Sequence, residues 1–163
     1  MNIKLLTLTA LSLLAIACAE KQEAMPAAEE AAATEPVVET TAAALPRSES
    51  VEGARVFFIS PADGDTVTSP VRIVFGIEGM AVAPAGDDTP QSGHHHLLID
   101  TDLPELGFPI PKDERHVHFG DGSTEAEISL EPGEHTLQML LGDHLHIPHD
   151  PPLVSDRITV IVE

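Results

Sequence analysis

The sequence predicts an all-β domain built as two packed sheets. Apolar and polar residues alternate over several short segments, and a period of two is the pattern of a strand that buries one face. Turn residues, mainly Gly, Pro and Asp, separate these segments, and no stretch after residue 54 carries apolar residues at helical spacing. Because the chain has five phenylalanines and no Trp or Tyr, aliphatic side chains must fill most of the core.

The clearest predicted strand lies within residues 67–80, where Val71, Ile73, Phe75 and Ile77 would share one face. The other predicted strands are residues 55–59, 94–100, 115–119, 124–130, 135–143 and 157–162. About seven short strands with turns between them predict an immunoglobulin-like two-sheet sandwich. The stretches FISPADGDTVTSPVRIVFGIEGM and LEPGEHTLQMLLGD also resemble bacterial immunoglobulin-like domains, in which such segments form early and late strands.

Residues 1–17 are predicted to be a lipoprotein signal peptide. A basic start precedes an apolar run, residues 5–17, that is too short to span a bilayer but suits a secretion signal. The sequence AIAC ending at Cys18 resembles a bacterial lipobox, which implies lipid on Cys18 and attachment to the membrane. By resemblance to sorted lipoproteins, Ala rather than Asp at position 19 favours attachment to the outer membrane, facing the periplasm. The alternative is an ordinary signal peptide followed by a chance cysteine, the only one in the chain.

Residues 18–53 are predicted to be a disordered tether, and residues 54–163 a single His-rich domain. The tether is rich in Ala, Glu, Pro and Thr and has few large apolar side chains, so it cannot bury enough surface to offset the entropy of ordering. A short helix over AAEEAAA is the alternative, but Pro26 and Pro36 bracket it and an isolated helix of that length is marginal.

The charge balance excludes two classes of partner. The chain has 27 acidic residues against 8 Lys and Arg, a formal net charge of −19. Phosphate backbones and anionic lipid headgroups would be repelled by such a surface, so we expect no nucleic acid partner. The same surface would attract cations, although an acidic surface alone usually serves solubility.

All nine histidines lie in the second half of the chain, in compact groups. Side chains at i and i+2 of a strand point to the same side, roughly 6.6 Å apart. His94 and His96 should therefore share a face opposite His95, and His116 should share a face with His118. The loop sequence GDHLHIPHDPP adds His144, His146 and His149.

The predicted topology brings these groups together. If seven strands run in order from A to G, the HHH sequence begins strand C just after the B–C loop. The HVH sequence then ends strand D and enters the D–E loop, and GDHLHIPHDPP is the F–G loop. These three loops lie at one end of an immunoglobulin sandwich. We therefore predict that distant histidines converge on one loop-end surface and bind a metal ion.

Ligand chemistry narrows the predicted ion to Zn or Cu(II). The domain offers imidazoles and carboxylates but no thiolate, and these donors suit borderline divalent metals. The predicted ligands are His96, His116, His118, His144, His146 and His149, with Asp143 and Asp150 completing the site or accepting imidazole N–H bonds.

Two other interpretations of the histidines remain open. A polar loop network could use imidazoles to bond backbone carbonyls, with Pro148, Pro151 and Pro152 stiffening the turn. A cluster of histidines near acids could also sense protons, because such groups titrate near physiological pH. His95 and His135, which point toward the apolar side, are predicted to be structural.

Three long motifs carry a family resemblance: GHHHLLIDTDLP, PIPKDERHVHFGDGSTE and LEPGEHTLQMLLGDHLHIPHDPPLVSDRITV. Together they resemble an uncharacterised family of small bacterial envelope domains over roughly residues 90–163. The resemblance implies no activity, but it implies that the His motifs are the family's signature. HVHFGDGS is also similar to the copper-ligand segment of copper–zinc superoxide dismutases. Its spacing is one residue short and that family's second signature is absent, which indicates convergent spacing.

These observations favour a lipid-anchored envelope domain that binds a divalent transition metal. The alternative is a non-catalytic envelope assembly or adhesion module with a structural polar His network and an envelope protein as partner. An enzyme ranks third, because no nucleophile motif such as G-x-S-x-G is present.

Overall fold

The computed structural model describes residues 43–163. The predicted signal peptide, the lipid attachment site Cys18 and most of the predicted tether lie outside the described residues. Within the described residues, no helix is long and apolar enough to cross a membrane.

The described residues form nine strands. They are β1 (Arg55–Ser60), β2 (Thr66–Val67), β3 (Val71–Glu78), β4 (Ala81–Val82), β5 (Ser92–Ile99), β6 (His116–His118), β7 (Glu125–Ile128), β8 (Gly133–Gly142) and β9 (Ile158–Val162). Each of the seven predicted strands overlaps one of them. The sequence does not reveal β2 and β4, because two residues are too few to show alternation.

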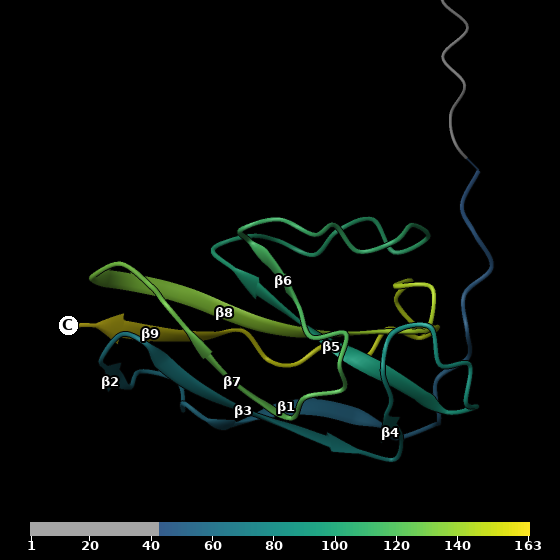
Figure 1. The fold of residues 1–163 in the computed structure, drawn as a ribbon, viewed down its shortest axis with the longest axis horizontal. Coiled ribbons are helices and arrows are strands. Elements are labelled where there is room, and N and C mark those ends of the chain that lie inside the picture. The colour runs from purple at the N-terminus through teal and green to yellow at the C-terminus, as the bar shows by residue number, and fades with distance from the viewer. Residues whose placement is uncertain (1–42) are drawn as a thin grey trace, which may run out of the picture. The chain divides into compact units, whose positions relative to one another are not determined.

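The strands form two sheets, which confirms the predicted sandwich. A three-stranded sheet has the order β1-β3-β7, and a six-stranded sheet has the order β2-β9-β8-β5-β4 with β6 paired to β5. Figure 1 shows β1 and β3 on one side of β5, β8 and β9. If the two-residue strands β2 and β4 are set aside, the arrangement is immunoglobulin-like: β1, β3 and β7 form one sheet, which faces β5, β8 and β9 of the other. The HVH strand β6 pairs with β5 at the six-stranded sheet.

The core fills the space between the two sheets with aliphatic side chains, as the composition requires. The inward residues of β3, β5, β8 and β9 are all nearly inaccessible to solvent: Val71, Ile73, Phe75, Leu97, Ile99, Leu137, Met139, Leu141, Ile158, Val160 and Val162. Their alternation along each strand is the period-two pattern of the sequence.

His95 lies in this core among apolar side chains. Its ring is fully buried and lies 4.9 Å from the ring of Phe75. Neither ring nitrogen has a hydrogen-bond partner among the described residues. Burial lowers the pKa of His95 to about 4, so the ring is neutral at pH 7. His95 therefore packs as a core residue, at the cost of an unsatisfied polar group.

The outer face of β5 is covered as well, so every residue of this strand is buried. Leu98 packs there against Ile110 and Leu140 in a second apolar cluster. Ile110 belongs to the connection of residues 100–115, which Figure 1 shows together with β6 on the side of β5 and β8 away from β1 and β3. This cover creates a second interior on the outer face of the six-stranded sheet.

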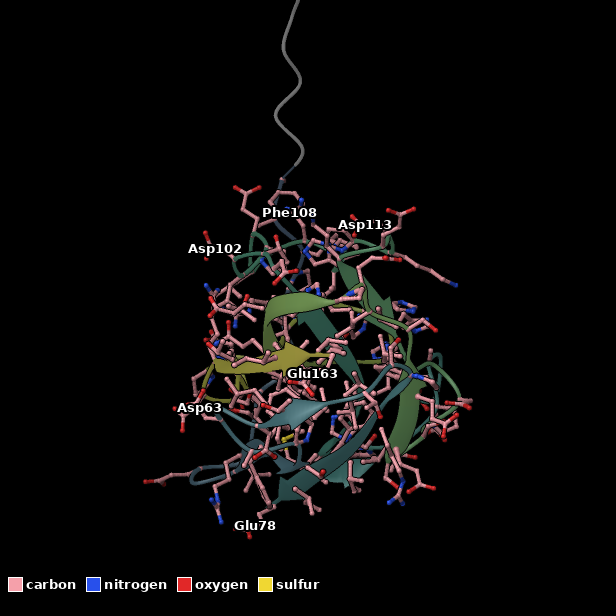
Figure 2. All side chains as sticks on the ribbon, turned by 90° about the vertical axis from the view of Figure 1, so that its left-hand side faces the viewer. Asp63, Glu78, Asp102, Phe108, Asp113 and Glu163 are labelled. Atoms are coloured by element: carbon pink, nitrogen blue, oxygen red, sulfur yellow. The ribbon has the colours of Figure 1, made fainter. Side chains whose placement is uncertain are left out.

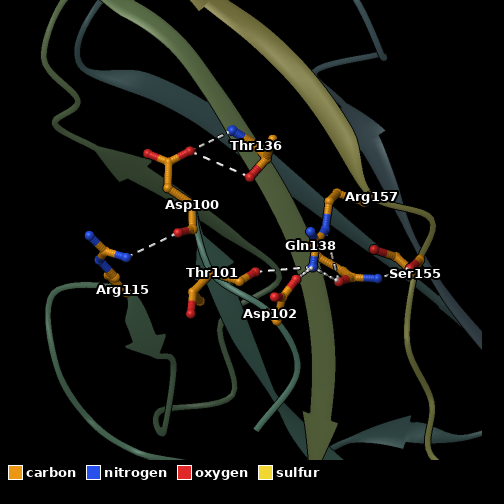
Figure 3. A network of polar contacts seen from close by, with 8 residues as sticks. All are labelled: Asp100, Thr101, Asp102, Arg115, Thr136, Gln138, Ser155 and Arg157. Carbon is orange, nitrogen blue, oxygen red and sulfur yellow. Dashed lines mark hydrogen bonds and ion pairs between the residues drawn. The ribbon is translucent and has the colours of Figure 1, made fainter.

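A polar network anchors the base of this connection (Figure 3). Asp100 has a positive φ of 51°, and its carboxylate accepts hydrogen bonds from the backbone N–H of Thr136 at 2.7 Å and from its hydroxyl. Arg115 donates to the Asp100 carbonyl oxygen at 3.2 Å. Arg157 donates to the carbonyl of Thr101 at 3.1 Å and to the carboxylate of Asp102. The first residues of the connection are thereby tied to β8 and to the segment before β9, and its last residue, Arg115, is tied to Asp100.

The acidic side chains lie mainly at the surface. Figure 2 shows the labelled carboxylates Asp63, Glu78, Asp102 and Asp113 at the periphery of the domain. Asp143 is the exception among the described acids, because only 2% of it is exposed. The negative charge is therefore a solvated outer layer rather than part of the core.

The fold begins before the predicted domain boundary at residue 54. The backbone N–H of Leu45 donates to the carbonyl of Gly107 at 2.9 Å, and that of Ser50 donates to the carbonyl of Asp150 at 3.0 Å. Arg47 also donates to the carbonyl of Pro148 at 2.9 Å. Composition alone assigns residues 45–50 to the tether, because their hydrogen-bond partners are far away in sequence. In the structure this segment is ordered against the domain.

We expect His95→Leu to stabilise the domain. The substitution replaces a ring with two unsatisfied buried nitrogens by an apolar side chain of similar size, so the free energy of unfolding should rise by about 1–3 kcal/mol. Urea unfolding with chelator present at about pH 7 measures this change. A loss of stability would show that the imidazole has a partner in the core.

A second prediction concerns His135, whose Nδ1 lies 2.7 Å from the carboxylate of Asp100. This hydrogen bond raises the pKa of His135. A raised folded pKa gives stability that is complete below the unfolded value of about 6.5 and is lost as pH rises through the folded pKa. His135→Ala should therefore destabilise the domain more at about pH 5.5 than at about pH 8.5. Equal losses of urea stability at both values would contradict the pairing.

Candidate functional site

Four imidazoles gather on the covered outer face of the six-stranded sheet. They belong to His94 and His96 of β5, His118 of β6 and His146 of the loop after β8. The centroids of the six ring pairs lie between 4.7 and 6.0 Å apart. We call this group the four-His cluster.

Strand geometry places three of the four rings. Residues at i and i+2 share a face, so His94 and His96 both point away from the core into which His95 points. The antiparallel register of β5 and β6 sets His118 directly opposite His96. Directly opposite residues in such a pair have neighbouring side chains, and this brings the third imidazole beside the first two.

A tight loop places His146. The Asp143 carboxylate accepts hydrogen bonds from the backbone N–H of Leu145 at 2.9 Å and of Ile147 at 3.0 Å. The N–H of His146 donates to the Asp143 carbonyl at 2.8 Å, and the His146 carbonyl accepts from Ile110 at the same distance. His146 has a φ of 68°, which is uncommon for a residue with a side chain. The hydrogen bonds around it hold this strained backbone in place.

The ring nitrogens are close enough to share one ion. The Nε2 atoms of His94 and His96 lie 3.0 Å apart, and those of His118 and His146 lie 3.1 Å apart. Ligand nitrogens of His94, His96 and His118 all lie within 4.8 Å of one another. In a tetrahedral site with metal–nitrogen bonds of 2.0–2.1 Å, the nitrogens are about 3.3 Å apart. Small side-chain rotations would therefore close the cluster on a single ion.

Two glycines leave room for the rings. A Cβ at Gly142 would lie 3.0 Å from Nε2 of His96 and 3.2 Å from the Cδ1 of Ile110. A Cβ at Gly120 would lie 2.6 Å from Nε2 of His118. Any larger residue at these positions would displace an imidazole, so the backbone around the cluster is shaped to accept it.

Burial keeps His94 and His96 uncharged. His94 and His96 are at most 1% exposed, whereas His118 and His146 are half-buried and open the cluster to solvent on one side. Desolvation, reinforced by the neighbouring imidazoles, lowers the pKa of His94 to about 4 and that of His96 to about 2. The same causes lower the pKa of His118. His94 and His96 are thus neutral at pH 7, and their lone pairs are available for a metal.

Hydrogen bonds among the four imidazoles do not satisfy all of their buried ring nitrogens. The Nε2 atoms face one another in pairs, and two facing nitrogens of neutral rings can share only one hydrogen. The Nδ1 atoms of His94 and His96 have no hydrogen-bond partner among the described residues. A polar network would give each buried nitrogen a donor or acceptor. An ion at the centre would instead use all four Nε2 lone pairs.

The predicted ligands divide into two groups. His96, His118 and His146 lie in the four-His cluster. His116 lies outside it, because its Nδ1 bonds the Asp113 carboxylate at 2.9 Å. The described contacts of His144 involve its backbone carbonyl, which accepts from the N–H of Gly86.

The other predicted members also lie outside the cluster. His149 is buried, with Nε2 3.2 Å from the carbonyl of Ser92. The oxygens of Asp143 are occupied by backbone N–H groups and by the hydroxyl of Ser48 at 2.7 Å. Asp150 is exposed and pairs with Arg47 at 3.3 Å. The two aspartates thus hold the loop in place and do not contact the imidazoles.

His94 is the member that the predicted ligand set omits. The signal that identifies it is its i, i+2 relation to His96, which places both on one face of a strand. The predicted convergence also takes a different form. The strand-borne histidines meet on the face of a sheet through the pairing of β5 with β6, and of the loop-borne histidines only His146 joins them.

Comparisons with known proteins agree with the expected uncharacterised family. No curated protein matches the chain. Among solved structures, the chain is similar to the fibronectin(III)-like modules of CbhA from Clostridium thermocellum, with 14% identity and a TM-score of 0.37. The match covers 67% of this chain and 45% of that one, so the chain spans less than half of its length. The sequence model of a family described as a domain of unknown function, DUF4399, matches residues 73–163. This match spans more than half of the sequence and includes the whole four-His cluster, and the chain therefore belongs to the DUF4399 family.

Proposed function

We propose that this domain binds one divalent transition metal ion, Zn or Cu(II), through His94, His96, His118 and His146. The observation that carries the proposal is the convergence of four imidazoles whose Nε2 atoms face one another in pairs, with the two innermost rings, His94 and His96, neutral. Imidazole is the common protein ligand of both metals.

The geometry favours Zn over Cu(II). Five of the six ring-centroid separations lie between 4.7 and 5.0 Å, and only that of His96 and His146 is longer, at 6.0 Å. Nearly equal separations suit a tetrahedron, which Zn adopts, whereas Cu(II) prefers a tetragonal plane with two long diagonals. Four protein ligands also complete a tetrahedral shell and leave no position for substrate. Metal buffering or delivery therefore fits the site better than hydrolysis.

The proposed setting is the bacterial envelope, with lipid on Cys18 anchoring the chain to the outer membrane on its periplasmic side. The AIAC sequence and the apolar run before it support this proposal. A surface with a formal net charge of −19 would concentrate divalent cations near the site while repelling nucleic acids. An envelope protein that supplies or receives the metal is the expected partner.

Matched histidine variants test the proposed site. His118→Ala and His146→Asn should weaken Zn binding by more than the roughly 10–100-fold that loss of an outer-shell partner costs. The controls are His116→Ala on the same strand and His144→Asn on the same loop, which should bind as the wild type does. Asn is used in the loop because it tolerates the positive φ of His146.

Titration against a chromophoric chelator measures these affinities on protein purified without a histidine tag. Millimolar or weaker binding by the wild type would overturn the proposed function. Equal losses in the His116 and His118 variants would overturn the assignment of ligands. Partner capture that survives chelator would favour an assembly module.

A separate experiment tests the anchor. Cys18→Ala in cells of the native host should move the protein from the membrane fraction to the soluble periplasmic fraction, because the residue that carries the lipid is lost. Immunoblots of the two fractions provide the measurement. Unchanged membrane association of the variant would contradict lipidation at Cys18.

A further inference from the structure

A segment before the first strand crosses the loop that carries His146. We call residues 45–50 the strap and residues 143–150 the His146 loop. The backbone N–H of Asp150 donates to the carbonyl of Ser48 at 2.8 Å, and Ser50 returns a bond to the carbonyl of Asp150 at 3.0 Å. The strap thus adds a short parallel pairing to a loop that lies outside the named strands.

Two strap side chains reach further into the His146 loop. Arg47 is largely buried, and its guanidinium donates to the carbonyls of Pro148 and His149. Ser48 donates its hydroxyl hydrogen to Oδ2 of Asp143 at 2.7 Å. These contacts satisfy both ends of the loop, which lacks regular sheet partners of its own.

A continuous set of hydrogen bonds leads from the strap to the cluster. One oxygen of the Asp143 carboxylate accepts from Ser48, and the other accepts from the N–H groups that flank His146. The carbonyl of Asp143 accepts from the N–H of His146 itself. A positive φ at a residue such as His146 persists only when its surroundings hold it. The position of this imidazole therefore depends on Asp143, and Asp143 is held in part by the strap.

We propose that the strap is a positioning element that sets the metal affinity of the four-His cluster by fixing His146. This inference rests on the proposed metal-binding function. If strap docking raises metal affinity, metal binding must stabilise strap docking by the same factor. The strap lies within the predicted tether, residues 18–53, so a cut or a partner that detaches residues 45–50 would lower affinity without touching a ligand.

Substitutions of the two strap side chains that contact the His146 loop test the proposal. Ser48→Ala and Arg47→Ala should each raise the Zn dissociation constant about 10-fold to 100-fold, the range for groups that orient ligands. Ser48→Thr retains the hydroxyl and should restore most of the affinity. Arg72→Ala is the matched control, because this exposed arginine pairs with Glu125 in the three-stranded sheet. Urea unfolding with chelator present verifies that each variant is folded.

A double-mutant comparison separates positioning from general weakening. In a His146→Asn background, Ser48→Ala should cause no further loss of affinity, because the group it positions is absent. Co(II) supplies a spectroscopic readout, since a tetrahedral nitrogen site gives intense visible absorption. The Ser48→Ala protein should shift toward the spectrum of His146→Asn.

The outcomes distinguish this inference from the proposed function. Absence of wild-type binding would overturn both. Wild-type binding with unchanged affinity and Co(II) spectrum in the two alanine variants would overturn the strap alone. Equal losses from Ser48→Ala in the wild-type and His146→Asn backgrounds would also overturn it, because the strap would then act through something other than His146.

Discussion

The structure depends on β5 being buried on both faces. Its alternation sends His95, Leu97 and Ile99 into the sandwich core and sends His94, His96 and Leu98 to the opposite side. Most strands of an antiparallel sandwich leave one face in water, but here β6 and the 100–115 connection cover the second face. Three consecutive histidines can therefore all be buried. Burial keeps His94 and His96, the two on the outer face, neutral and able to bind a cation rather than a proton.

This burial has an energetic consequence for the metal-free protein. His94 and His96 remain neutral well below the ordinary pKa of an imidazole, so protonation does not stabilise them, and their Nδ1 atoms have no hydrogen-bond partner among the described residues. The cluster contains no carboxylate, so a bound divalent ion would keep its charge in a half-covered site. The acidic surface offsets that charge only at a distance. A site of this kind gains its affinity from nitrogen lone pairs and geometry, which suits an ion that is exchanged rather than permanently fixed.

Alternation along the chain predicts the seven strands longer than two residues, the two-sheet fold and the shared face of His94 and His96. The choice between His116 and His118 depends on the register of β6 against β5, which no local pattern reveals. His144 has the same i, i+2 spacing to His146 that His94 has to His96, and the exclusion of His144 and His149 follows from the Asp143 turn and the positive φ of His146. The sequence does not reveal the strap, because its partners lie far away in sequence and most of them are backbone groups. From composition alone, the segment is assigned to the tether.

The four members of the cluster are not held alike, and this difference bears on how an ion would enter and leave. His94, His96 and His118 are placed by paired strands, whose register cannot change without breaking the sheet. His146 is placed by a loop that depends on a carboxylate and on a segment before the first strand. Release of His146 would leave three fixed imidazoles and one open position, on the side where the cluster already meets solvent. Exchange by this route requires no change in the sandwich, because only the loop-borne ligand has to move.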